Sequence, residues 1–338
     1  MIPIERVVSR LQGQPSDRIP FVPVTTLYGA ALANIPLDKY YCNAEFYAKG
    51  QQAVVDNIEP DILFGPFTLA FEAEAFGAQL AHFSNNVPNI KTPAISDYSQ
   101  IKHLELPNIE KHAGLNFIIE SVRELSSHYK NQIPVAAILS SPTELPALIM
   151  GIENWIDTLL FHPDEAQHML KITRQFFIQL ADKFHRAGAT AMVTMANFCN
   201  PTIVTQHIAA KQLIPVLQNT YNEAKLPVFV HHGGARLLPF LELFNNLPNV
   251  AGFVVDPRDS LADTRNLIGE QAALMGKLNS SMLPKVPAGI VEKWTNEILE
   301  ESNNDPRFFF ATSNADIPLN TPLENLKAIV KTIRKFQS

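Results

Sequence analysis

Two adjacent histidines followed by two glycines are the clearest candidates for chemistry in this sequence. His231 and His232 follow the short apolar run Val228 to Val230, and Gly233 and Gly234 come next. Imidazole exchanges a proton near neutral pH and binds transition metals. Neighbouring side chains on a strand point to opposite faces, so both rings reach one site only if the backbone turns at the glycines. We expect His231 to be catalytic or a metal ligand, and His232 to bind substrate.

Carboxylates follow other apolar runs in the same way. Asp256 comes directly after Val254 and Val255, and Glu72 lies beyond the run 62–64. A carboxylate at such a place can act as a general base, a metal ligand or a helix cap. We expect Asp256 and Glu72 to join His231 in catalysis. If they converge with it, an all-nitrogen and oxygen metal site is open to them.

Further polar residues at equivalent positions are expected to bind substrate. A buried lysine is costly unless it is paired, so Lys277 either meets an anion in the site or extends outward. Glu144 lies where it can stabilise the first turn of a helix. The full set of expected substrate-binding residues is Glu144, Asn197, His232, Lys277, Asn314 and Asp316.

The elements that must position these residues are short apolar strands alternating with amphipathic helices. The strands are expected at 62–64, 135–139, 192–194, 228–230, 253–255, 274–275 and 308–311, with helices at 164–187, 210–223, 236–243 and 323–336. This alternation indicates a parallel sheet covered by helices. No G-x-G-x-x-G follows a strand, which argues against a Rossmann sheet. We predict an α/β fold of the (β/α)₈ TIM-barrel type, with its chemistry at the C-terminal ends of the strands.

The chain reads as one domain over residues 1–338, because no linker or change of composition interrupts it. Residues 1–58 are expected to form an N-terminal extension of helices and loop that caps the barrel, and residues 59–338 the barrel. The segment 1–13 has the alternation of an amphipathic helix.

Composition narrows the classes of partner. Hydrophobic residues make up 46% of the chain, charged residues 18%, and the net charge is −6. A globular protein without a broad basic face is not expected to bind nucleic acid or an anionic membrane. No apolar run approaches the ~20 residues of a membrane span. The two cysteines cannot form a disulfide framework, so we expect a cytoplasmic protein that binds a small molecule.

Four short motifs, in order along the chain, resemble those of the uroporphyrinogen decarboxylase superfamily, and within it the methylcobalamin:coenzyme M methyltransferase branch. They are the "DRIP" of 17–20, the "EAEAFG" of 72–77, Asp256 followed by the "LMGKL" of 274–278, and the "TPLENL" of 321–326. The resemblance runs nearly end to end and implies a (β/α)₈ barrel. It also implies a transferase that moves a methyl group between a methylcorrinoid, carried by a corrinoid protein, and a small acceptor.

The resemblance also implies a zinc site, which this sequence carries only in part. Methyltransferases of that branch hold zinc with a His-x-Cys pair and a later cysteine. His231 matches the histidine, but Gly233 and Ala315 stand where the cysteines belong. Because thiolates are missing, we expect a non-thiol acceptor, such as a pterin, activated by protonation rather than by zinc.

Two alternatives remain open from the sequence. One is a uroporphyrinogen decarboxylase-type enzyme of porphyrin biosynthesis. Such enzymes grip substrate carboxylates with an arginine-rich loop and use a catalytic aspartate. The comparable stretch 25–33 has no arginine here, and Thr68 occupies the place of the aspartate. The other is a non-catalytic ligand-binding barrel, which a mouth filled by side chains would favour.

Overall fold

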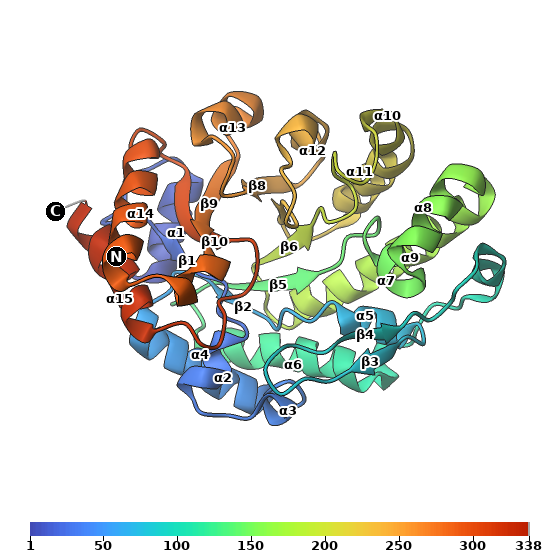
Figure 1. Cartoon of the computed structure of the whole chain (residues 1–338), viewed down its shortest axis with the longest axis horizontal. Helices are drawn as coiled ribbons and strands as arrows, with labels where there is room; N and C mark the ends of the chain where they lie inside the picture. The colour runs from blue at the N-terminus through green and yellow to red at the C-terminus, as the bar shows by residue number, and fades with distance from the viewer. Residues whose placement is uncertain (337–338) are drawn as a thin grey trace.

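Eight short parallel strands form a nearly closed barrel in the computed structural model, which describes residues 1–336 (Figure 1). Residues 337 and 338 of the expected domain lie outside that range. The neighbours around the sheet follow the order β1-β10-β9-β8-β7-β6-β5-β2. The strands are β1 (Phe21–Val22), β2 (Leu63–Phe64), β5 (Val135–Leu139), β6 (Ala191–Met195), β7 (Val228–His231), β8 (Val250–Val254), β9 (Ala273–Asn279) and β10 (Phe308–Ser313). The predicted (β/α)₈ barrel is confirmed.

Helices lie between the strands and cover the outside of the barrel (Figure 1). They are α1 (Pro3–Leu11), α2 (Tyr28–Leu32), α3 (Leu37–Tyr40), α4 (Ala44–Ile58), α5 (Ala70–Ala75), α6 (Ala113–His128), α7 (Leu145–Met150), α8 (Ile152–Phe161), α9 (Pro163–Arg186), α10 (Gln206–Ile208), α11 (Ile214–Glu223), α12 (Leu241–Asn245), α13 (Leu261–Ile268), α14 (Ala288–Glu301) and α15 (Leu323–Phe336). The hairpin β3 (Gln79–Ala81) and β4 (Asn89–Thr92) stands apart from the barrel. In the part of the chain described, no helix has the length and apolarity to cross a membrane.

Alternation along each strand separates two apolar clusters. On β5, Ala136 and Ile138 belong to the cluster inside the barrel, whereas Val135, Ala137 and Leu139 pack in the larger cluster against the helices. This period of two is the ordinary geometry of a strand buried on both faces. It explains why the strands read as unbroken apolar runs in the sequence.

The expected cap over residues 1–58 is wrong in one respect. β1 lies inside that range and pairs with β10, through Phe21 with Phe310 and Val22 with Ala311. The N-terminal segment therefore supplies a barrel strand as well as helices. A strand of two residues followed by Pro23 is too short to give a periodic signal, which is why the sequence did not identify it. It also makes β2 the second barrel strand.

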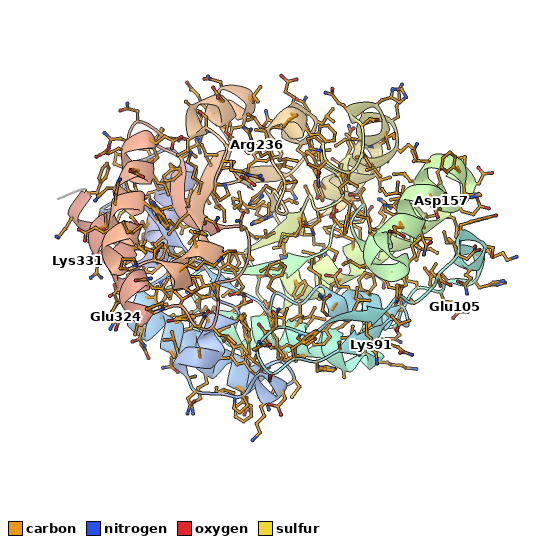
Figure 2. All side chains as sticks on the ribbon, in the orientation of Figure 1. Lys91, Glu105, Asp157, Arg236, Glu324 and Lys331 are labelled. Atoms are coloured by element: carbon orange, nitrogen blue, oxygen red, sulfur yellow. The ribbon has the colours of Figure 1, made fainter. Side chains whose placement is uncertain are left out.

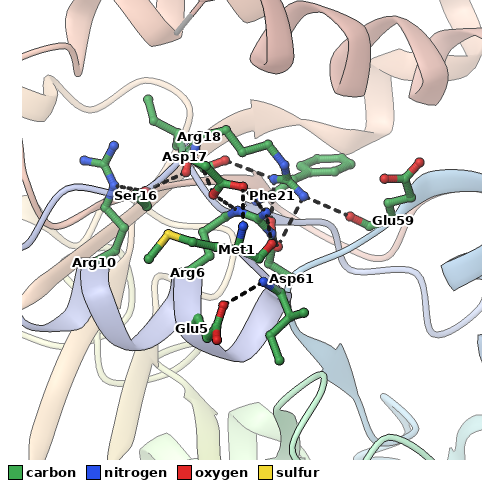
Figure 3. A network of polar contacts seen from close by, with 12 residues as sticks. Met1, Glu5, Arg6, Arg10, Ser16, Asp17, Arg18, Phe21, Glu59 and Asp61 are labelled. Atoms are coloured by element: carbon green, nitrogen blue, oxygen red, sulfur yellow. Dashed lines mark hydrogen bonds and ion pairs between the residues drawn. The ribbon is translucent and has the colours of Figure 1, made fainter. Parts of the chain in front are cut away.

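A buried carboxylate closes the barrel between β1 and β2 (Figure 3). Asp61 is fully buried, and its Oδ2 accepts hydrogen bonds from the Phe21 backbone N–H and from Arg18 Nη1, both at 2.6 Å. Arg6 of α1 donates to its Oδ1 and also binds Asp17. The two arginines compensate the buried charge. The network fixes α1 against the N-terminal ends of β1 and β2.

Candidate functional site

His231 lies at the C-terminal end of β7 and points into the barrel. Phe229 belongs to the interior cluster, so the alternation of β7 directs His231 to the same side. Its Nδ1 accepts a hydrogen bond from the Gly233 N–H at 3.0 Å. An accepting Nδ1 places the ring proton on Nε2. The Nε2–H has no partner among the described residues and is the polar group that His231 presents to the interior.

Electrostatics keep His231 neutral. Burial, together with the neighbouring His232, lowers its pKa well below the usual histidine value, and this outweighs the attraction of Asp256. A neutral imidazole with its proton on Nε2 is a hydrogen-bond donor rather than a cation. It can polarise a heteroatom of a bound molecule.

The alternation of a strand predicts that His232 points away from His231, but the structure differs. β7 ends at His231, the backbone turns at the two glycines, and the two imidazole rings stack with centroids 4.5 Å apart. The His232 nitrogens lie near two backbone donors, Gly234 N at 3.0 Å from Nδ1 and Asn314 N at 3.3 Å from Nε2. A neutral ring has one accepting nitrogen, so it satisfies one of them at a time. His232 thus links β7 to the end of β10.

Asp256 is held by Arg258, and both of its oxygens accept hydrogen bonds from that guanidinium at 2.7 Å. Burial alone would raise the pKa of Asp256, but Arg258 outweighs it and keeps the pKa below its usual value. The ionised carboxylate lies 3.5 Å from His232 Nδ1. Asp256 is therefore paired with Arg258 and is not a free base. The spacing of two residues in Asp-Pro-Arg is the sequence feature from which the pairing of Asp256 with Arg258 could have been predicted.

A second ion pair lies at the same rim. Arg236, placed between α12 and α13 in Figure 2, binds Asp259 at 2.6 Å. Arg236 and Arg258 are about half and two-thirds exposed, whereas their aspartates are buried. The rim beside the histidines therefore carries two solvent-facing guanidinium groups.

An apolar cavity of about 460 Å³ occupies the barrel below His231. Its lining reaches from Val7 and Leu11 of α1 to His231, Thr312 and Ala315 at the opposite end. The lining contains neither lysine nor arginine, and neither aspartate nor glutamate. The interior of the barrel is therefore not filled by side chains. A polar donor at the end of an apolar cavity has the character of a small-molecule site.

Glu72 and Glu144 are fully buried and serve the backbone. Glu72 Oε1 accepts the Ser140 N–H at 2.8 Å, which ties α5 to the end of β5. Both oxygens of Glu144 accept from the Phe198 N–H, and Oε1 also from the Cys199 N–H. Burial raises the pKa of each carboxyl to about 8. Each therefore clamps the loop after the next strand.

Replacing Glu72 with glutamine is expected to remove part of the pH dependence of stability. In the folded protein the pKa of Glu72 is about 8, against about 4.3 when unfolded. The unfolded chain loses its proton first, so stability falls as pH rises between these values. The glutamine amide cannot ionise and keeps an acceptor for the Ser140 N–H. The Tm of Glu72→Gln should exceed that of the wild type by an amount that grows from pH 5 to pH 8.

The control is Glu124→Gln, which alters an exposed glutamate of α6. Its Tm should follow the wild-type curve. Parallel curves for Glu72→Gln and the wild type across this pH range would show that Glu72 is ionised when folded.

Lys277 is not directed at the mouth, which corrects the expectation that it binds substrate. Its Nζ donates to the Asp259 carbonyl at 2.7 Å and pairs with Glu301 of α14 at 2.8 Å. The ammonium therefore takes the outward alternative, where a carboxylate and a carbonyl compensate its charge.

Asn314 and Asp316 follow β10 and differ in their hydrogen-bond partners. Asn314 Nδ2 donates to Asn279 Oδ1 at 3.0 Å, beside its backbone contact with His232. Asp316 Oδ2 accepts from the Leu27 N–H at 2.8 Å and from Thr26, whereas Oδ1 is buried without a partner. Burial raises the pKa of Asp316 to about 7. Asp316 thus holds the segment after β10 against the start of α2.

The residues present do not fit the zinc site of the methyltransferase branch. Within residues 1–336, no three histidine, cysteine, aspartate or glutamate side chains gather closely enough to hold a metal. Gly233 packs against the backbone of Asn197, with a φ of +67°. Asn197, expected to bind substrate, thus contacts the turn that carries the histidines. No step of the chemistry below is assigned to a protein-bound metal.

Comparison with known proteins places these features in a family. The family model "Uroporphyrinogen decarboxylase (URO-D)" matches residues 3–336. The chain is 20% identical to a methylated-thiol–coenzyme M methyltransferase of Methanosarcina mazei over 99% of this chain and 90% of that protein. It is 24% identical to a uroporphyrinogen decarboxylase of Idiomarina loihiensis over 78% and 74% of the respective chains. A solved methyltransferase from Methanosarcina mazei superposes over the whole of both chains with a TM-score of 0.89 at 19% identity, which shows the same fold.

Proposed function

Because the chain belongs to the uroporphyrinogen decarboxylase family, we propose that it transfers a methyl group between a small molecule and a methylcorrinoid carried by a partner protein. The corrin ring would stand over the mouth, and the small molecule would lie below it beside His231. The observation that carries this proposal is the unpaired Nε2–H of His231 at the end of an apolar cavity. Methyltransferases among the relatives agree with it.

The Nε2–H of His231 would donate a hydrogen bond to the heteroatom that carries the methyl group. In the demethylating direction, Co(I) of the corrinoid substrate supplies the electron pair of the new cobalt–carbon bond. The carbon–heteroatom bond breaks and leaves its pair on the heteroatom. The neutral His231 donor stabilises that developing negative charge through a hydrogen bond, and solvent supplies the proton that the product takes up. The reverse reaction releases the same proton.

The cavity does not suit a porphyrinogen. Such a substrate carries many carboxylates, which need cationic or N–H partners. The stretch 25–33, which includes α2, has no lysine or arginine, and the two arginines at the rim, Arg236 and Arg258, are already paired with Asp259 and Asp256. Decarboxylation is therefore not the function that the site supports best.

Methyl transfer can be tested with free cob(I)alamin in place of the partner's corrinoid. Incubation with methyl ethyl sulfide or methyl phenyl ether should convert Co(I) to methyl-Co(III), followed by cobalt absorbance, and should release the demethylated product. Uroporphyrinogen should yield no carbon dioxide in a parallel assay. Carbon dioxide from uroporphyrinogen without any methyl transfer would overturn the proposal.

A further inference from the structure

We propose that the interior of the barrel binds the apolar body of the substrate, an uncharged molecule with one oxygen or sulfur at the end next to His231. This inference rests on the proposed function and names its substrate class. The cavity runs through the barrel rather than lying over it. Its lining includes α1 at the N-terminal ends of the strands and His231 at the C-terminal end.

Small inward-facing residues create the space. Ala136, Ala191, Ala251 and Ala311 all line the cavity, from four different strands. In most barrels of this type, layers of bulky branched side chains fill the same volume. A volume of about 460 Å³ is about three times that of an engineered cavity that binds benzene, which is ~150 Å³. It falls within the range of small-molecule sites.

The polarity of the lining restricts the ligand to an apolar body with one polar end. The hydroxyl of Thr312 accepts the Val24 N–H at 2.9 Å, and that of Thr190 donates to the Val135 carbonyl at 3.2 Å. Both hydroxyl oxygens are thus engaged with the backbone. Gln271, the other polar amide of the lining, lies before β9 at the opposite end from His231 and accepts from Arg307 at 3.5 Å. His231 Nε2–H is left at the mouth end. A charged ligand would lose its hydration without gaining a partner.

Helix α1 lies across the other end of the cavity. Ile4, Val7, Val8 and Leu11 of this amphipathic helix line it. The helix is anchored by Arg6 to Asp61 and by the Ile4 N–H to the Gln132 carbonyl. A ligand with its polar end beside His231 would therefore extend its apolar end toward α1.

The length of the cavity gives a direct test. Ala191 begins β6, and Met195, which pairs with His231, ends it. At about 3.3 Å per residue, Ala191 lies about 13 Å along the strand from the level of His231. A leucine at this position fills the α1 end of the cavity without touching the polar end.

Calorimetric titration with methyl ethyl, butyl, hexyl and octyl sulfide, without corrinoid, measures the effect. Wild-type affinity should rise about fourfold with each added methylene until the cavity is full. Ala191→Leu should bind methyl ethyl sulfide normally and lose the gain for the longer sulfides. Ala136→Leu, lining the same cavity, provides a second variant should the first misfold. Ala31→Leu on the exposed surface of α2 is the matched control and should bind the whole series like the wild type.

Affinity that does not change with chain length would overturn the inference, and so would an Ala191→Leu variant that is more stable but binds the series unchanged. In that case the cavity is an empty void. The proposed function fails separately: chain-length-dependent binding without methyl transfer refutes the transferase but not the binding site. Methyl transfer with flat affinities refutes the binding site alone.

Discussion

Replacing His231 with leucine should lower the turnover of methyl transfer by about 10²- to 10³-fold, the usual loss when one preorganised donor is removed. Leucine keeps the apolar volume but has no N–H for the heteroatom that receives charge. The change should fall mainly on kcat, because the donor acts most strongly when the bond breaks. His231→Gln, whose amide offers an N–H at similar reach, should recover part of the loss.

Two measurements separate this role from a structural one. His207→Leu alters an exposed histidine and should leave turnover unchanged. Because the pKa of His231 is well below the usual histidine value, the ring is neutral at pH 6.5. The wild-type rate should therefore show no loss near pH 6.5 from protonation of this residue. Full turnover in a folded His231→Leu variant would remove His231 from the mechanism.

The place of the site could be predicted from the sequence because it depends on strand ends. Short apolar runs located every barrel strand except β1, and polar residues after them gather at one end by the geometry of parallel strands. His231 follows directly from this. The apolar runs carry no information about which group each polar side chain binds. The bond of Asp256 to Arg258, and that of Lys277 to Glu301, depend on loop and helix positions that no periodicity encodes.

The motifs that carry the family resemblance turn out to hold the scaffold. Arg18 of the "DRIP" motif binds Asp61 and closes the barrel, and Glu72 of the "EAEAFG" motif binds the loop after β5. Asn325 of the "TPLENL" motif donates to the carbonyls of Leu283 and Val286. Such residues keep the fold recognisable while the chemistry at the mouth changes. This is why the family was easier to infer from the sequence than the reaction.

Replacing Gly233 with cysteine, the residue expected there in the zinc-binding branch, should destabilise the fold by about 2–5 kcal/mol and create no zinc site. Gly233 has a φ of +67°, where a side chain is strained. A Cβ at this position would lie 2.6 Å from the Asn197 N and 2.8 Å from its Cα. Since both are backbone atoms, no rotamer change of Asn197 relieves the clash.

Gly234→Cys is the matched control. Its φ is +88°, but nothing lies within 4 Å of its Cβ. It should show the strain without the clash, so urea unfolding should find it more stable than Gly233→Cys. Adding Ala315→Cys to Gly233→Cys supplies all three ligands, one histidine and two cysteines, yet zinc should neither bind stoichiometrically nor raise the Tm. Asn197→Gly should not rescue it, because the backbone of residue 197 still occupies the space. Tight zinc binding by the double variant would mean that this turn can move, and that the loss of zinc chemistry needed only two substitutions.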